Sequence, residues 1–163
     1  MIRNEELPVY IKHFAELKTT ELYGILQARE QVFTLEQGVT CEDIDGLDTK
    51  CTHMWCESDG KVIAYLRMIP AGLCYRQPSI GRVLVLPDWR RKGLSRRLMD
   101  MAISYIATAW GGLGIMISAQ GYLVDFYSDL GFHVVSDEYL DGGIPHYKML
   151  MQSGHIADAE DIF

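Results

Sequence analysis

The sequence predicts a mixed α/β fold, in which one sheet has helices on its faces. Short β-rich apolar runs alternate with stretches whose apolar residues recur at helical spacing, and glycine and proline separate them. The chain has 163 residues, of which 48% are hydrophobic and 23% are charged, as is usual for a globular domain. We therefore expect a single domain over residues 1–152 and a flexible acidic tail over residues 153–163.

The first elements are expected to be a strand and a long helix. Residues 9–14 are rich in residue types that favour strands. Apolar side chains then recur at helical spacing, and Thr19 or Thr20 can cap a helix that runs to about Glu36. Residues 37–50 are acidic and contain two glycines, so they are expected to form an irregular loop.

A β-hairpin and another strand are expected next. Residues 52–57 and 61–69 are apolar runs, and Ser58-Asp59-Gly60 between them is a turn signal. Glycine and two prolines mark residues 70–78 as a loop. Residues 80–86 then form an apolar run that is typical of a buried strand.

The second half is expected to contain two helices and three strands. Its long helix is amphipathic and ends at a group of three glycines, and a further glycine ends the short helix. The expected helices are residues 96 to about 109 and residues 122–130, and the expected strands are residues 115–119, 132–139 and 146–151.

Charge and hydropathy exclude several classes of protein. The net charge of −7 argues against a general nucleic-acid binder. No apolar run approaches the roughly 20 residues that a membrane span needs. The N-terminal residues 1–7 are charged and lack the apolar centre of a signal peptide, so a cytoplasmic location is expected.

The cysteines do not indicate a metal site. No two of them form a Cys-x-x-Cys pair. Cys51, His53 and Cys56 lie close together in the sequence, but a structural zinc site needs four ligands at recognisable spacing and no second ligand pair is present. Reduced thiols and no metal are therefore expected.

The segment from Ile80 to Leu98 carries the clearest functional signal. Pro87-Asp88-Trp89 ends the strand, and the basic turn Arg90–Ser95 opens the next helix. Five of the fifteen Lys and Arg residues fall within eight positions here. The first N–H groups of a helix have no internal partner and the helix dipole makes them positive, so the turn predicts a site for a phosphorylated ligand. Lys92-Gly93 has the wrong order for a Walker loop, and a single glycine does not match a dinucleotide fingerprint.

This turn resembles the acyl-CoA loop of the GNAT acyltransferase superfamily. The pattern of that loop is Gln/Arg-x-x-Gly-x-Gly/Ala, which here stands as Arg90-Arg91-Lys92-Gly93-Leu94-Ser95 and departs only at Ser95. Asp125–Phe132 is similar to a second hallmark, Phe-Tyr-x-x-x-Gly-Phe. The chain from Pro8 to Met151 resembles the ElaA-like branch, on four further segments: Arg29–Gln37, Asp43–Asp48, Ile80–Val83 and Gly143–His146.

The resemblance implies a mostly antiparallel sheet of about six to seven strands, in which two parallel strands splay apart to hold acyl-CoA. Those strands would be Arg82–Leu86 and Ile115–Ala119. The backbone of the first would pair with the pantetheine arm, and the N–H of Val85 could polarise the thioester carbonyl. The cofactor-binding residues implied are Val83, Leu84, Val85, Arg90, Arg91, Lys92, Gly93, Leu94, Ser95 and Arg96.

Catalytic roles are also implied by the resemblance. Tyr127 would donate a proton to the leaving thiolate, and Glu36 is the first candidate for the general base. Three further side chains, Asp45, His53 and His146, and an ordered water remain open as alternatives for the base. The resemblance places the acceptor near Arg82, Asp45 and His53.

Arginine inside a buried strand needs a partner, so Arg82, together with Arg29, binds either a substrate carboxylate or acidic residues of the chain. The acidic residues of the 37–50 loop either attract a cationic substrate or form a solvated surface.

We therefore expect an N-acetyltransferase that moves an acetyl group from acetyl-CoA directly to a primary amine, without a covalent acyl-enzyme. The acceptor would be a small-molecule or peptide amine. No nucleic acid, membrane or metal is expected, and a homodimer is compatible with the superfamily. The alternatives are an acyl-CoA-binding sensor without turnover and an acyl-homoserine-lactone-type synthase.

Overall fold

The computed structural model describes residues 2–153, and the expected tail over residues 153–163 lies outside this range except for Ser153. Its eight-stranded sheet has the order β1-β2-β3-β4-β5-β8-β6, with β7 also paired to β8. The strands are β1 (Val9–His13), β2 (Thr52–Ser58), β3 (Lys61–Ile69), β4 (Ser79–Val85), β5 (Ile115–Gln120), β6 (His133–Val134), β7 (Tyr139–Asp141) and β8 (Ile144–Met151). Only the pairing of β4 with β5 is parallel among these residues. The predicted mixed, mostly antiparallel fold is confirmed.

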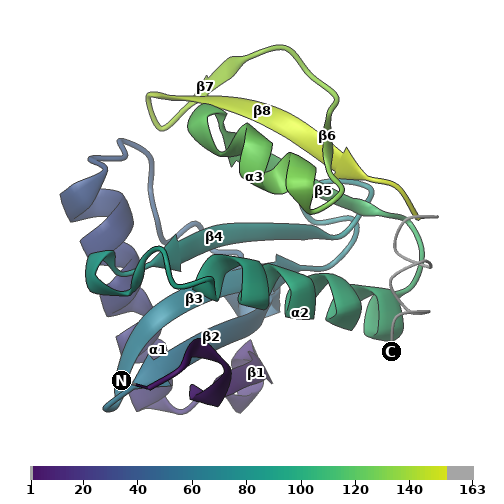
Figure 1. The fold of residues 1–163 in the computed structure, drawn as a ribbon. Coiled ribbons are helices and arrows are strands. Elements are labelled where there is room, and N and C mark those ends of the chain that lie inside the picture. The colour runs from purple at the N-terminus through teal and green to yellow at the C-terminus, as the bar shows by residue number, and fades with distance from the viewer. Residues whose placement is uncertain (1, 154–163) are drawn as a thin grey trace.

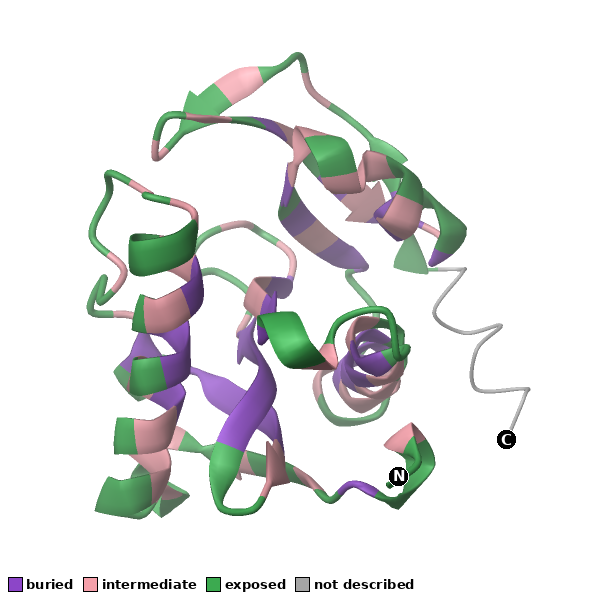
Figure 2. Cartoon of the chain, turned by 60° about the vertical axis from the view of Figure 1, so that its left-hand side comes forward, coloured by how far each residue is buried: buried purple, intermediate pink, exposed green. Residues whose placement is uncertain are grey.

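Within residues 2–153, three α-helices cover the sheet: α1 (Thr19–Arg29), α2 (Leu94–Trp110) and α3 (Val124–Asp129). Helix α1 packs on β3 and β4, and α2 packs on β2, β3 and β4 from the opposite side (Figures 1 and 2). Helix α3 covers β5 and touches β6 (Figure 1). The central strands β2 and β3, which lie between α1 and α2, consist largely of buried residues (Figure 2). None of the helices in residues 2–153 has the length and apolar character needed to cross a bilayer.

The sheet opens between β4 and β5. These strands pair at one register position only, Ser79 with Met116. A β-bulge lies further along β4, because Leu84 pairs with Tyr65 and Gly81 with Arg67, so two residues of β4 oppose one of β3. Bulged Arg82 has a left-handed φ of 52°. Since a bulge bends its strand and increases its twist, β4 turns away from β5 beyond this point.

The first helix differs from the expectation. It begins at Thr19 with Lys18 as the N-cap, because the carboxylate of Glu21 accepts the N–H of Lys18 at 2.8 Å and replaces a threonine hydroxyl. It ends as an α-helix at Arg29 and continues to Glu36 as a π-helix. In a π-helix each carbonyl accepts the N–H of the residue five positions later, so its turns are wider than those of an α-helix. Such turns are common at functional sites.

Two later elements also differ. Helix α2 begins at Leu94, two residues before the expected start, because Gly93 has a φ of 78° and turns the chain directly into the helix. The expected strand over residues 132–139 is reduced to the short strands β6 and β7. Between them Ser136 Oγ accepts the N–H of Lys148 at 2.9 Å, so a side chain replaces the strand ladder there.

Gly114 is expected to be required for the connection between α2 and β5. Its φ is 80°, and a Cβ atom there would overlap the carbonyl oxygen of Met151. We expect Gly114→Ala to lower the free energy of unfolding by at least about 1 kcal/mol. Gly112→Ala is the matched control, because a Cβ there meets nothing within 4 Å, and it should change stability by less than about 0.5 kcal/mol. Equal urea midpoints for the two variants would contradict this packing.

Candidate functional site

A cleft of about 300 Å³ lies where β4 and β5 separate. The two strands line it with eight residues: Ser79, Ile80, Gly81, Arg82, Val83, Ile117, Ser118 and Gln120. The remaining lining residues come from the end of the π-helix, the 39–47 and 74–75 loops, β3, the turn before α3, α3 itself and the β7–β8 hairpin: Phe33, Thr34, Gln37, Val39, Cys41, Asp43, Asp45, Leu47, Arg67, Ile69, Cys74, Tyr75, Tyr122, Leu123, Tyr127, Asp141 and His146. The opening of the sheet is thus a lined cavity with access from several elements.

The turn between β4 and α2 presents unpaired backbone N–H groups. Arg91 and Gly93 have φ values of 62° and 78°, so two of three consecutive residues adopt the left-handed backbone conformation. The N–H of Arg97 donates to the carbonyl of Gly93 at 3.1 Å and closes the first helical turn. The N–H groups before it, those of Leu94, Ser95 and Arg96, therefore have no partner within the helix. Such a run of exposed N–H groups at a helix N-terminus is suited to an anion.

Three exposed cations surround these N–H groups: Arg91, Lys92 and Arg96. None of them forms an ion pair within residues 2–153. The Nζ atom of Lys92 lies 4.8 Å from the ring centroid of Trp89. Their charges remain available to attract an anionic ligand to the helix.

The N-terminal segment supports the turn from behind. Asn4 Nδ2 donates to the carbonyl of Lys92 at 2.8 Å, and Arg97 donates to the carbonyls of Asn4 at 2.6 Å and Leu7 at 3.0 Å. Because a trans peptide directs its C=O and N–H in opposite directions, the bond from Asn4 directs the N–H of Gly93 away from the N-terminal segment. Asn4 is 88 residues from its acceptor and belongs to no motif, so the sequence does not predict this contact.

Arg90 has a structural task. Its Nε atom donates to the carbonyl of Val85 at 2.9 Å, and its two terminal nitrogens bind both carboxylate oxygens of Glu36 at 2.8 and 2.5 Å. The hydrogen bond from Arg90 lowers the pKa of Glu36. Glu36 does not line the cleft, and its pairing joins the end of the π-helix to the basic turn.

Tyr127 lines the cleft from α3 and is 7% exposed. Its ring packs edge-on against Phe126 and Phe132, with centroids 5.1 and 6.1 Å apart. Burial raises the pKa of the phenol well above its usual value, so the hydroxyl is protonated at neutral pH and can donate a proton.

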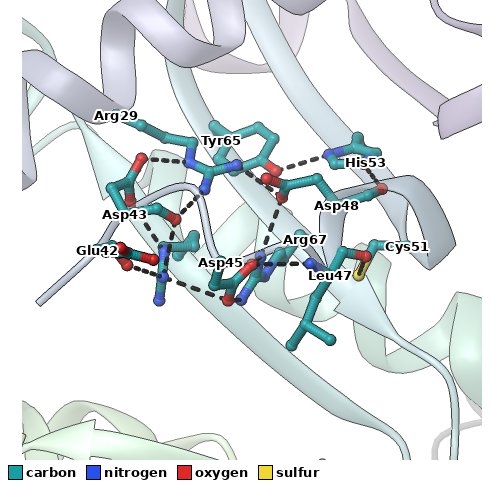
Figure 3. Close-up of polar contacts among 11 residues, drawn as sticks. Arg29, Glu42, Asp43, Asp45, Leu47, Asp48, Cys51, His53, Tyr65 and Arg67 are labelled. Atoms are coloured by element: carbon teal, nitrogen blue, oxygen red, sulfur yellow. Dashed lines mark hydrogen bonds and ion pairs between the residues drawn. The ribbon is translucent and has the colours of Figure 1, made fainter. Parts of the chain in front are cut away.

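Three arginines and three aspartates form one network of ion pairs (Figure 3), and four of the six, Asp43, Asp45, Arg67 and Arg82, line the cleft. Arg29 of α1 is fully buried and binds Asp43 through Nε at 2.9 Å and Asp48 through Nη1 at 2.7 Å. It also donates to the carbonyl of Asp43 at 2.7 Å. These bonds attach the 42–48 loop to the first helix.

The other half of the network attaches the same loop to the sheet. Arg67 of β3 binds Asp45 at 2.9 and 2.5 Å and Asp48 at 3.0 Å, while bulged Arg82 of β4 lies 2.9 Å from Asp43 and 3.4 Å from Asp45. Burial alone would raise the pKa of Asp45, but its bonds with Arg67 and with the N–H of Leu47 lower it far below its usual range. Arg82 thus has acidic partners within the chain, one of its two predicted alternatives.

The four side chains considered as bases lie in different surroundings. Asp45 lines the cleft and is held by arginines, and His146 lines it from β8. His53 does not line it: it is fully buried on β2, with Nδ1 2.7 Å from the hydroxyl of Tyr65 and Nε2 2.9 Å from the carbonyl of Asp48. The structure therefore brings Asp45, Arg82 and Tyr127 together and leaves Glu36 and His53 outside the cleft.

All four cysteines are free thiols: Cys51 and Cys56 are buried, and Cys41 and Cys74 are exposed and line the cleft. No cluster of three His, Cys, Asp or Glu side chains suited to a metal occurs in residues 2–153. Cys51 is buried and donates to the carbonyl of Leu47 at 3.1 Å, and burial raises its pKa to about 11. A thiol in this state is protonated and unreactive at neutral pH.

Removing Asp48 is expected to destabilise the network strongly. Burial alone would raise the pKa of Asp48, but Arg29 and Arg67 lower it, so its charge stabilises the fold at neutral pH. Asp48→Asn should cost about 3–5 kcal/mol, because it leaves buried guanidinium charge uncompensated. Asp100→Asn, an exposed site on α2, should change the unfolding free energy by less than about 0.5 kcal/mol.

The same pair of variants tests the sign of the effect. A lowered carboxyl pKa contributes stability above its unfolded value of about 3.9 and loses it as the pH falls further. Wild-type stability should therefore decline more steeply than that of Asp48→Asn below about pH 4. Parallel stability curves from pH 7 to pH 3 would contradict an ion-paired Asp48.

Comparisons with known proteins identify the family to which the chain belongs. A family model described as an acetyltransferase (GNAT) domain matches residues 29–153. An acyl-CoA N-acyltransferase from Pseudomonas aeruginosa superposes with a TM-score of 0.84 at 36% identity, over 88% of this chain and 98% of that one. The crystal structure of Escherichia coli ElaA also gives a TM-score of 0.84, at 29% identity over 90% of this chain and 99% of that one. Aligned by sequence, ElaA is 32% identical over 139 residues, which are 84% of this chain and 91% of that protein. The chain therefore belongs to the GNAT acetyltransferase family, in the branch that contains ElaA.

Proposed function

We propose that this protein transfers an acetyl group from acetyl-CoA to a primary amine. The observation that carries the proposal is that one strand, β4, connects two features. β4 lines the cleft that contains a protonated phenol, and it leads into the turn where unpaired N–H groups and uncompensated cations lie at the start of α2. A diphosphate fits the first feature and a thioester fits the second.

The start of α2 would hold the diphosphate of the donor. Its N–H groups, from Arg91 to Arg96, would bind the phosphate oxygens, and the three exposed cations would speed capture. Arg90 would act indirectly, because its guanidinium is occupied by Glu36 and Val85. The edge of β4 that turns away from β5, over Val83, Leu84 and Val85, would offer backbone groups to the pantetheine amides.

The chemistry would follow from a thioester placed between β4 and β5. An amine attacks the thioester carbonyl, the N–H of Val85 stabilises the oxyanion, and Tyr127 gives its proton to the departing thiolate. Burial suits Tyr127 to this task, because it keeps the phenol protonated until a thiolate forms beside it.

The acceptor would enter through the polar part of the cleft. Asp45 and Arg82 line this part, yet each is held by the arginine–aspartate network, so we assign them to shaping the acceptor pocket. His53 would act from behind by holding the carbonyl of Asp48. The acceptor is then a small-molecule or peptide amine.

Release of free thiol from acetyl-CoA tests the proposed function. The protein is mixed with acetyl-CoA and amines of several classes, such as an amino acid, a polyamine and a peptide with a free N-terminus, and thiol is followed with a chromogenic disulfide. We expect thiol release that depends on both the amine and the enzyme. Acetyl-CoA binding without thiol release for any amine would instead identify a sensor, and failure to bind acetyl-CoA would contradict the proposal entirely.

Tyr127→Phe is expected to separate binding from turnover. The ring and its packing remain, so the dissociation constant for acetyl-CoA should change by less than about twofold. Turnover should fall by a factor of about 100, as is usual when a general acid is removed. Phe126→Leu, which alters the neighbouring ring and keeps the phenol, controls for packing. Unchanged turnover in Tyr127→Phe would remove the phenol from the mechanism.

A further inference from the structure

His146 presents an unoccupied basic nitrogen to the cleft. Its Nδ1 atom lies 2.7 Å from the carbonyl oxygen of Ile144, an acceptor, so Nδ1 carries the proton of the neutral ring. The lone pair is then on Nε2, which makes no hydrogen bond within residues 2–153. The ring is 8% exposed and stacks on Tyr139 at 6.1 Å, which fixes its plane. A histidine in this tautomer can accept a proton at Nε2.

His146 and Tyr127 approach the gap from opposite faces of the sheet. In β5 the buried residues Ile115, Ile117 and Ala119 form one row, and this row faces α3, which carries Tyr127. Side chains alternate between the two faces along a strand, so Gln120, which follows Ala119, points to the other face. Gln120 pairs with His146 of β8, and paired residues of neighbouring strands share a face, so His146 points there as well. Both faces meet at the cleft, because His146 and Tyr127 line the same cavity.

A thioester held in the gap between β4 and β5 would therefore have an acid on one side and a base on the other. The α3 side holds the phenol, which suits the leaving sulfur. The β7–β8 side holds the imidazole together with Asp141, a carboxylate of the cleft that forms no ion pair within residues 2–153. An ammonium group arriving from this side would meet a negative charge and then a proton acceptor.

The other side chains considered as bases are already engaged in hydrogen bonds. Asp45 accepts four hydrogen bonds, from the N–H of Leu47 and from two arginines, and both nitrogens of His53 are hydrogen-bonded, so either group would have to break a bond before it could take a proton. Both carboxylate oxygens of Glu36 are bound by Arg90, whose hydrogen bonds and positive charge lower the pKa of Glu36 and oppose its protonation. Nε2 of His146 makes no hydrogen bond within residues 2–153.

We propose that His146 is the general base that removes a proton from the acceptor amine, an inference that rests on the proposed acetyl transfer. Nε2 takes a proton from the ammonium, and the neutral amine attacks the thioester carbon. The new C–N bond forms, the C–S bond breaks, and Tyr127 protonates the sulfur. The second proton of the amine nitrogen returns to the phenolate, and His146 releases its proton to water, so an ammonium ion and acetyl-CoA give an amide, CoA and one proton.

Kinetics of His146→Ala test this assignment against Glu36→Gln. The readouts are kcat with the amine that gives the fastest thiol release in the wild type, and the dissociation constant for acetyl-CoA. His146→Ala should lose about a hundredfold or more in kcat. Its affinity for acetyl-CoA should stay within twofold, which also shows that the variant is folded. Glu36→Gln should keep a larger share of turnover than His146→Ala. His133→Ala, at an exposed site on β6, is the matched control and should behave as the wild type.

Rescue by imidazole separates a base from a packing residue. Added imidazole should restore part of the turnover of His146→Ala and leave the wild type and Glu36→Gln unchanged, because a small base can enter the space that the ring vacates. Wild-type turnover in His146→Ala, or a hundredfold loss that appears in Glu36→Gln instead, would overturn the assignment while acetyl transfer stands. A wild-type protein that releases no thiol with any amine would overturn the proposed function and this role of His146 together.

Discussion

The parting of β4 from β5 is the constraint on which the rest of the structure depends. Strands that separate after one paired position leave backbone groups without their usual partners, and such groups are costly to bury unless a ligand or water binds them. The bulge at Arg82 produces the separation, and its left-handed backbone persists because Arg82 is held by Asp43 and Asp45. A sheet that has been opened in this way keeps a cleft at its centre.

The distribution of charge follows from the same opening. Around the wall of the cleft, three arginines and three aspartates neutralise one another and attach the 42–48 loop to α1, β3 and β4. At the start of α2 the opposite holds, since the exposed cations there have no acidic partner within residues 2–153. An acidic chain with a net charge of −7 thus keeps a local positive surface for an anion. The Glu36–Arg90 pair joins the end of the π-helix to the basic turn.

The features that the sequence predicted are those encoded by neighbouring residues. The strand, the proline that ends it and the glycine turn of residues 80–95 are encoded by neighbouring residues, and so is the hairpin around Asp59. The structure confirms these elements, and the comparisons confirm the family that the motifs indicated. The π-helix and the shortened strands were not predictable, because they depend on which distant groups satisfy the backbone. Residue roles at the site remain predictions.

Other parts of the site depend on long-range contacts and left no trace in the sequence. Asn4 reaches the carbonyl of Lys92 across 88 residues, and Arg90 and Arg97 belong to the basic run yet are used to hold backbone and carboxylate groups. The sequence put Glu36 first among the four candidate bases, and nothing in the sequence shows which of them is already hydrogen-bonded. Their ranking depends on which lone pairs are already engaged, and for His146 it depends on a carbonyl two residues away that determines the tautomer.

A crystal structure of the protein with bound CoA tests the central claim most directly. We predict the diphosphate on the N–H groups of residues 91–96, the pantetheine arm along Val83–Val85 in the gap between β4 and β5, and the sulfur beside the hydroxyl of Tyr127. The coenzyme bound elsewhere, with β4 and β5 closed against each other, would contradict the account.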